Sequence, residues 1–354
     1  MGNLISKYQK EIDNFLEKSI ENSFSFSESP VKDIFLESGK IFKENEWKVC
    51  GEIIFDRQSV KLSDIIGQTN VKDLLYVGIE SCKDSNRTLD HVLLFGPPGN
   101  GKSMIANAIA NELSAEIIQF FGTELKDKST FEDLIDCLKT FSKQKKVIFV
   151  DEIHNIPVKS GELLYQAMQD FVIDDTRIDK FTLIGATTNP GKLQRPFRDR
   201  FTYNIKLDQY SIDDIKEIVL RKFPKFSPDL AAFVASRSKL IPRIAIHFST
   251  IIESAAIYDN STPSVSHGFF VMNLLKVDSL GLNENDRNVL KLLYRSSGHT
   301  LGKNTIIASL DIDESDYNFM IEPILLRMGL LSIIPKGRTL TSSGKSLAKS
   351  YSTK

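Results

Sequence analysis

The central part of the chain alternates short apolar runs with longer stretches of helical periodicity. Apolar runs occur at 91–95 (HVLLF), 116–120 (EIIQF), 146–150 (KVIFV), 181–187 (FTLIGAT) and 203–207 (YNIKL). Runs that are apolar throughout are typical of strands buried on both faces. Because helical stretches separate them, the pattern predicts a parallel sheet covered by helices, an α/β core over 61–208.

After this core the periodicity becomes purely helical. Residues 211–223 and 227–238 both open on a serine that is followed by acidic residues in the first turn. This is the composition of helix N-termini, because the serine oxygen accepts from free backbone N–H groups. The pattern predicts a small helical lid over 209–278.

The last part of the chain, 279–354, predicts a winged helix. Helical stretches over 284–296, 303–310 and 313–328 lead into the apolar run LLSIIP, a KGR turn and TLTSS. Three helices followed by a two-stranded wing form a relative of the helix-turn-helix fold, which commonly binds DNA.

The N-terminal extension, residues 1–60, begins with an amphipathic pattern. Ile5, Tyr8, Ile12, Phe15 and Ile20 follow the spacing of one helix face. The serine-rich stretch SFSFSESP then interrupts the pattern. We expect a helix here that either packs on the main body or serves as a docking arm for a partner.

The composition bears on the location and the partners of the protein but does not identify its function. Hydrophobic residues make up 41% and charged residues 26%, and no apolar run approaches the roughly 20 residues that span a bilayer. The formal net charge of −1 gives no global signal for nucleic acid, so any DNA contact must be local. Three scattered cysteines suit reduced thiols, so we expect a cytoplasmic protein without a membrane partner.

A phosphate-binding loop follows the first apolar run. The stretch FGPPGNGKSM contains G-x-x-x-x-G-K-S between a predicted strand and a predicted helix, the context that a P-loop requires. In such a loop the lysine reaches the β/γ-phosphates of ATP and the hydroxyl holds Mg²⁺. The predicted nucleotide-binding residues here are Gly96, Pro97, Pro98, Gly99, Asn100, Gly101, Lys102, Ser103 and Met104.

Two carboxylates follow the strand at 146–150. Asp151 is placed to order Mg²⁺, and Glu152 is placed to polarise the attacking water. A further strand ends at Thr187–Thr188–Asn189, where a polar side chain can contact both γ-phosphate and water. Three arginines in RPFRDRF and Arg243 in IPRIA offer positive charge near a nucleotide, although solvated loops have the same composition.

Together these segments resemble the RuvB family of AAA+ motors. The resemblance lies in LSDIIGQTNV, LDHVLLFGPPGNGKS, VIFVDEIH, LLYQAMQDF, FTLIGATT, FRDRF, IPRIA, IEPILLRMGLL and PKGR, which occur in the family's order over about 62–345. It implies a AAA+ P-loop ATPase core with a parallel sheet, a helical lid and a C-terminal winged helix. It also implies that Thr188 is sensor 1, Arg200 an arginine finger acting in trans, and Arg243 sensor 2. Ile65, Ile66 and Tyr210 fall where the family lines its adenine pocket.

Some segments depart from the family pattern. A long hairpin that engages RuvA in the family is reduced to the nine residues VIDDTRIDK, and the family's R-P before the adenine pocket is Arg57 and Gln58 here. The third helical stretch of the winged helix is acidic, which disfavours it as a DNA reader. The PKGR loop, with Lys336 and Arg338, is the predicted DNA contact, and a solvated basic tail is the alternative.

The leading hypothesis is an ATP- and Mg²⁺-dependent translocase of double-stranded or branched DNA, including Holliday junctions. We expect it to assemble as a ring, a hexamer, that can work with a protein loader, and the short hairpin argues against docking to a RuvA-type protein in the family's manner. The alternative is a nucleotide-switched protein remodeller or scaffold, or a clamp-loader-like ATPase, that binds partners through its N-terminal helix and winged helix.

Overall fold

The computed structural model describes residues 60–85, 87–140, 145–173 and 175–352, so the expected N-terminal helix, Arg57 and Gln58 lie outside the described residues. The described chain forms two compact units, which we treat one at a time. The first holds 60–65, Asn70–Leu94 and Ser103–Ile205. The second holds Ile66–Thr69, Phe95–Lys102 and the chain from Lys206 onward. No helix in the described ranges is long and apolar enough to cross a membrane.

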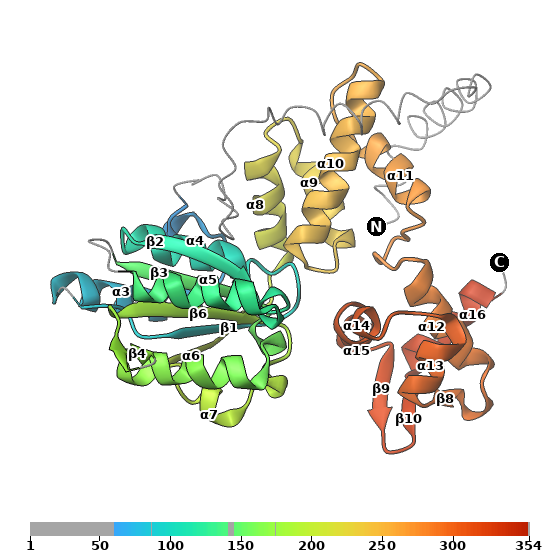
Figure 1. Ribbon diagram of the computed structural model, residues 1–354. Helices are drawn as coiled ribbons and strands as arrows, with labels where there is room; N and C mark the ends of the chain where they lie inside the picture. Colours follow the sequence, from blue (N-terminus) through green and yellow to red (C-terminus); the bar gives the residue numbers. More distant parts are fainter. Residues whose placement is uncertain (1–59, 86, 141–144, 174, 353–354) are drawn as a thin grey trace. The chain divides into compact units, whose positions relative to one another are not determined.

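A five-stranded parallel sheet organises the first unit, and helices cover both of its faces, with α4 on one and α6 on the other (Figure 1). The strand order is β2-β3-β6-β1-β7. All five predicted strands are confirmed, as β1 (Val92–Phe95), β2 (Glu116–Phe121), β3 (Lys146–Asp151), β6 (Phe181–Thr187) and β7 (Tyr203–Lys206). The helices of this part are α3 (Thr69–Asp84), α4 (Lys102–Glu112), α5 (Lys128–Lys139), α6 (Val158–Asp170) and α7 (Arg195–Arg198).

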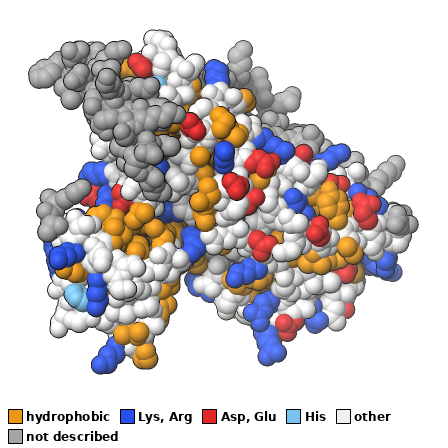
Figure 2. Space-filling model, turned by 180° about the vertical axis from the view of Figure 1, so that it is seen from behind, with side chains coloured by type: hydrophobic (Ala, Val, Ile, Leu, Met, Phe, Trp, Pro, Cys, Tyr) orange, Lys and Arg blue, Asp and Glu red, His pale blue; other side chains and the backbone are white. Residues whose placement is uncertain are grey.

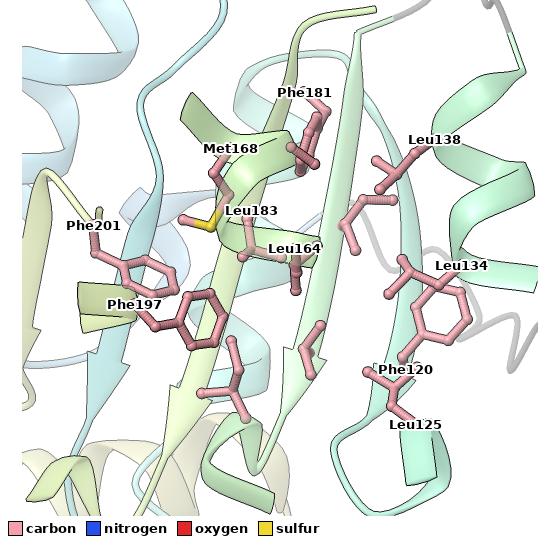
Figure 3. Close-up of a cluster of buried hydrophobic side chains, with 14 of the residues drawn as sticks. Phe120, Leu125, Leu134, Leu138, Leu164, Met168, Phe181, Leu183, Phe197 and Phe201 are labelled. Atoms are coloured by element: carbon pink, nitrogen blue, oxygen red, sulfur yellow. The ribbon is translucent and has the colours of Figure 1, made fainter. Parts of the chain in front are cut away.

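The strands end at one edge of the sheet because their registers are aligned. Phe121 of β2 lies opposite Asp151 of β3, and Val150 opposite Gly185 of β6. The core beneath them is apolar: Leu164 and Met168 from α6 pack against the sheet with Leu134 from α5 (Figure 3). The sheet edge that carries the candidate site is therefore supported by a packed apolar core.

The hairpin after α6 is short, as its sequence predicts. Strands β4 (Val172–Ile173) and β5 (Thr176–Arg177) pair antiparallel over two residues each. Of these residues only Ile173 is buried. The hairpin therefore presents little apolar surface to a partner.

The second unit contains four lid helices, α8 (Ile212–Lys222), α9 (Pro228–Arg237), α10 (Pro242–Tyr258) and α11 (Val265–Leu274). Both predicted serine caps are confirmed. The Ser211 hydroxyl accepts from the Asp214 N–H at 3.0 Å, and the Ser227 hydroxyl accepts from the Leu230 N–H at 3.2 Å. Such caps typically contribute about 1 kcal/mol to helix stability.

The predicted winged helix is confirmed, with differences in its sheet, its third helix and its C-terminal end; the expected two-stranded wing is part of a three-stranded sheet. Its elements are α12 (Glu284–Arg295), β8 (Thr300–Leu301), α13 (Lys303–Leu310), α14 (Glu314–Asp316), α15 (Glu322–Arg327), β9 (Leu331–Ile334), β10 (Gly337–Leu340) and α16 (Ser342–Ser352). The helical stretch expected over 313–328 is broken by a π-helical turn at Tyr317–Ile321. The end of the chain is not a solvated basic tail up to residue 352, because α16 buries Ala348 in the domain core.

A buried ion pair joins the lid to the winged helix within the second unit. Lys239, in the loop between α9 and α10, contacts Asp286 of α12. Their side chains are 6% and 0% exposed. The Arg327 guanidinium of α15 also donates to the Lys239 carbonyl, at 3.1 Å. These bonds fix the loop that leads into α10 against the first helix of the winged helix.

Candidate functional site

The P-loop connects β1 to α4, the strand-loop-helix context that its sequence requires. Gly99 and Gly101 have φ values of +79° and +88°, in the left-handed region that residues with a Cβ rarely adopt. A Cβ on Gly99 would also lie 2.8 Å from the Cβ of Arg243. The loop backbone is thus free of side chains where phosphate oxygens would be held.

Lys102 is already turned toward this loop. Its Nζ donates to the carbonyl oxygens of Gly96 and Pro97, both at 3.0 Å, and the residue is 7% exposed. These two backbone oxygens help to hold the ammonium at the loop. Around it Asn100 is buried, whereas Met104 on the first turn of α4 is 42% exposed.

Lid residues of the same unit lie against the P-loop. Arg243, at the start of α10, packs its Cβ next to Gly99 while remaining exposed. Tyr210 is buried and its hydroxyl donates to the Asn100 carbonyl at 3.2 Å. Burial raises the pKa of Tyr210, so it stays a neutral donor. These contacts bring two predicted nucleotide-binding residues to the loop.

The predicted adenine-pocket residues Ile65 and Ile66 differ in environment. Ile65 is 1% exposed and its carbonyl accepts from Lys72 Nζ at 2.9 Å, so its side chain is part of the core. Ile66 is only half-buried. Gln68, which sequence reasoning missed, fixes the segment by two bonds to the Asp208 backbone, at 2.7 and 2.8 Å.

Two acidic residues and a hydroxyl gather at the carboxyl end of β3, in the first unit. Ser103 Oγ lies 3.5 Å from Asp151 Oδ2, so the two predicted metal ligands are side by side. The other Asp151 oxygen accepts from the Glu152 N–H at 2.9 Å. Hydroxyl and carboxylate oxygens are the donors that Mg²⁺ prefers. The residues present therefore fit the predicted cation.

Glu152 leaves the strand in a left-handed conformation. Its φ and ψ are both 47°, which costs a non-glycine residue roughly 1–2 kcal/mol. The residue that follows β2 is bonded to this turn: the Gly122 N–H donates to the Asp151 carbonyl at 2.7 Å. The strained turn directs Asp151 and Glu152, although adjacent in sequence, to different positions.

One carboxylate oxygen of Glu152 accepts two hydrogen bonds from Thr188 and lies close to a histidine nitrogen. Oε2 lies 3.2 Å from the Thr188 N–H, 3.1 Å from the Thr188 hydroxyl and 3.1 Å from His154 Nδ1. Within the described part of the chain, no hydrogen bond is made to Oε1. Thr188 comes from the end of β6, so the predicted sensor and the predicted base are in direct contact.

Arg200 follows α7 and differs from its neighbours. Arg195 is placed 3.8 Å from Asp199, whereas Arg200 is exposed and forms no ion pair with any described residue. An exposed, unpaired guanidinium beside the ATPase core is available to a second molecule. Its role in trans stays a prediction.

The two residues of the predicted DNA contact have different environments. Lys336, at the wing tip, is exposed, and so are Ile333 and Ile334 before it. The Arg338 guanidinium instead forms a bidentate pair with Glu322, at 2.5 and 3.1 Å, with side chains 20% and 12% exposed. Arg338 therefore serves the fold of the winged helix, whereas Lys336 is exposed and forms no ion pair with any residue that the structure describes.

Acidic and basic side chains are interspersed on the face of the protein shown in Figure 2. Among the described residues, no cluster of three or more His, Cys, Asp and Glu side chains could hold a metal ion.

The P-loop, the acidic turn after β3, the sensor threonine and the helical lid define a AAA+ ATPase with a C-terminal winged helix.

Comparison with known proteins identifies the family. Residues 58–207 match the family described as "Holliday junction DNA helicase RuvB P-loop domain", and residues 279–349 match "RuvB C-terminal winged helix domain". The Holliday junction branch migration complex subunits RuvB of Nitratiruptor sp. and Helicobacter pylori J99 are 37% and 36% identical to the chain. The alignments cover 78% and 81% of this chain, and 87% and 89% of the relatives.

A solved structure of the Thermotoga maritima RuvB Holliday junction branch migration motor has the same fold. Its TM-score is 0.74 at 35% identity, and the match covers 82% of this chain and 97% of that one. The chain belongs to the RuvB family of AAA+ ATPases.

Proposed function

We propose that this chain is an ATP-driven translocase of double-stranded DNA that assembles as a ring and moves Holliday junctions. One observation carries the proposal. In one RuvB-family chain, the proposed base Glu152 is hydrogen-bonded to the proposed sensor Thr188, and the winged helix has an exposed lysine, Lys336, at its tip. The relatives' role in branch migration supports the choice of substrate.

The ATP site is proposed to work as follows. The P-loop N–H groups and Lys102 bind the phosphates, and Ser103 and Asp151 hold Mg²⁺, which neutralises phosphate charge when bound. Glu152 accepts the proton of the attacking water through Oε1, since Oε2 accepts two hydrogen bonds from Thr188. Thr188 orients this base, Arg243 contacts the nucleotide from the lid, and Arg200 completes the site of a neighbouring subunit. Gly96 to Met104, Ile66 and Tyr210 complete the proposed nucleotide contacts.

DNA contact is proposed at the wing tip. Lys336 is exposed and is not part of an ion pair in the described structure, whereas Arg338 is occupied by Glu322. A single basic loop suits contact with the DNA backbone without reading sequence. We therefore retain Lys336 as a DNA contact and assign Arg338 to supporting the wing.

A second function, nucleotide-switched protein remodelling, is favoured by one observation. The short β4–β5 hairpin offers little apolar surface for a RuvA-type loader, so a different partner would have to recruit this ATPase. The cytoplasm remains the expected location of either activity.

The test is steady-state ATP hydrolysis by the full chain, alone and with matched amounts of duplex and four-way junction DNA at low and moderate salt. We expect stimulation by DNA that weakens with salt, because phosphate contacts release counterions. Glu152→Gln should bind ATP but hydrolyse it at least about 100-fold more slowly, the usual contribution of a general base.

Variants at the wing separate the DNA contact from the fold. Lys336→Ala should weaken DNA binding and reduce the salt slope by about one, whereas Lys225→Ala in the lid should not. Hydrolysis that is indifferent to every DNA would reject the translocase and favour remodelling.

A further inference from the structure

The histidine of the acidic turn has no role in the function proposed above. His154 lies in the 3-10 turn Ile153–Asn155 that follows Glu152, and its side chain is 8% exposed. Nδ1 lies 3.1 Å from Glu152 Oε2 and 2.9 Å from Thr187 Oγ1. The ring thus bridges the residue after β3 and the last residue of β6.

The chemistry of the partners assigns the proton on this ring. An ionised carboxylate only accepts hydrogen bonds, so a bare Nδ1 lone pair facing Glu152 at 3.1 Å would be repelled. The tautomer that carries hydrogen on Nδ1 instead donates to the carboxylate. The Thr187 hydroxyl, which also accepts from the Asn189 N–H at 2.9 Å, shares this hydrogen.

We propose that His154 is a positioning residue for ATP hydrolysis: its Nδ1–H, together with Thr188, holds Oε2 of Glu152 so that Oε1 faces the attacking water. Thr188 alone supplies two donors, both from the end of β6. His154 supplies the third from the other side of the strained turn, and so restrains rotation of the carboxylate. This inference rests on the proposed role of Glu152 as the base.

Two amide variants test whether the donor must lie at the position of Nδ1, because both keep a polar N–H group at residue 154. In His154→Asn the amide nitrogen is attached to Cγ, as Nδ1 is, and can take its place. In His154→Gln the amide lies one carbon farther out. His154→Ala removes the donor altogether, and His247→Ala, at an exposed histidine of α10, serves as the matched control.

We expect kcat to fall roughly 10- to 100-fold in His154→Ala and His154→Gln, the scale of a small misplacement of a catalytic group. His154→Asn should recover to within about threefold of wild type, and the Kd of a fluorescent ATP analogue should change less than about threefold in all of them. His247→Ala should match wild type.

Three results would overturn the inference: unchanged kcat in His154→Ala, equal activity of the Asn and Gln variants, or a loss of nucleotide binding that parallels the loss of kcat. Glu152→Gln is assayed alongside. If that variant hydrolyses ATP normally, the role of Glu152 fails, and this outcome is distinguishable because it does not depend on residue 154. In the Glu152→Gln background, His154→Ala should cause no further loss.

Discussion

At the scale of single residues, His91 shows how a histidine can serve the fold alone. It precedes β1 and is 7% exposed, with its ring 5.4 Å from that of Phe181. Nδ1 accepts from the Leu183 N–H at 2.9 Å, and Nε2 lies 3.2 Å from the Met168 carbonyl. The ring is therefore neutral with hydrogen on Nε2, and burial lowers its pKa.

This histidine makes folding sensitive to acid. Because the folded state binds the proton less readily than the unfolded chain, the free energy of unfolding should fall as the pH drops below about 6.5, the ordinary histidine pKa. His91→Leu leaves a buried donor and acceptor unpaired, which should cost roughly 2–5 kcal/mol at pH 8. Urea unfolding between pH 8 and pH 5.5 measures both effects.

His91→Leu should also show a flatter dependence of stability on pH than wild type. His154, whose pKa burial also lowers, adds to the acid sensitivity of both proteins. A slope that His91→Leu does not alter would contradict the assignment.

Residue identity predicted which polar side chains lie together at the sheet edge better than it predicted their contacts. Asp151, Glu152 and Thr188 could be chosen from their positions after apolar runs, because strand ends of a parallel sheet share one edge. The two bonds from Thr188 to Glu152 Oε2 could not be predicted, because they depend on the left-handed backbone of Glu152. The ion pair of Arg338 depends on Glu322, which lies 16 positions earlier, and the periodicity of the sequence does not predict such a pairing.

At the scale of elements, the sequence predicted the five parallel strands and the capped lid helices. It missed α16, because serine and lysine predominate in that helix and only a few apolar positions, Ala348 among them, mark its buried face. It also missed the π-helical turn at Tyr317–Ile321, since one extra residue in a helix leaves the apolar pattern nearly unchanged. Both misses occur where packing, and not local composition, decides the backbone.

The contact between the end of β2 and the end of β3 sets the position of the acidic turn at Asp151 and Glu152. A Cβ on Gly122 would overlap the Glu152 carbonyl oxygen, which is backbone and cannot turn aside. Gly122→Ala should therefore displace the turn and lower kcat by about 10- to 100-fold. Steady-state hydrolysis and thermal unfolding of the variant test this prediction.

Gly161→Ala is the matched control. Gly161 lies inside α6, and the nearest atom to an added Cβ is 4.0 Å away, an ordinary contact. Alanine in a helix interior should raise the free energy of unfolding by roughly 0.5–1 kcal/mol and leave kcat unchanged. If Gly122→Ala and Gly161→Ala change kcat equally, steric overlap with the Glu152 carbonyl is not the reason that position 122 needs glycine.

At the scale of the whole molecule, each ATP site of the proposed ring is formed by residues from two neighbouring subunits. Glu152→Gln and Arg200→Ala should each be inactive alone. When they are mixed, a subunit with an intact base can lie beside one with an intact arginine, and random assembly gives about a quarter of the interfaces both groups. Hydrolysis should therefore reappear on mixing.

Mixing identifies where Arg200 acts. If Arg200 serves its own subunit, no mixed interface regains both groups and activity stays absent. Nucleotide binding by Arg200→Ala should equal that of wild type at protein concentrations too low for assembly. Reduced binding there would likewise indicate a role within one subunit.

The buried pair of Lys239 and Asp286 has a consequence for how this family can diverge. Replacing either partner alone leaves an unpaired charge in the interior, at a cost of about 3–5 kcal/mol, whereas replacing both with apolar residues is nearly neutral. The two positions lie 47 residues apart, in different domains. They can therefore be inherited together or exchanged together, and a chimera that takes its lid from one lineage and its winged helix from another must preserve the match.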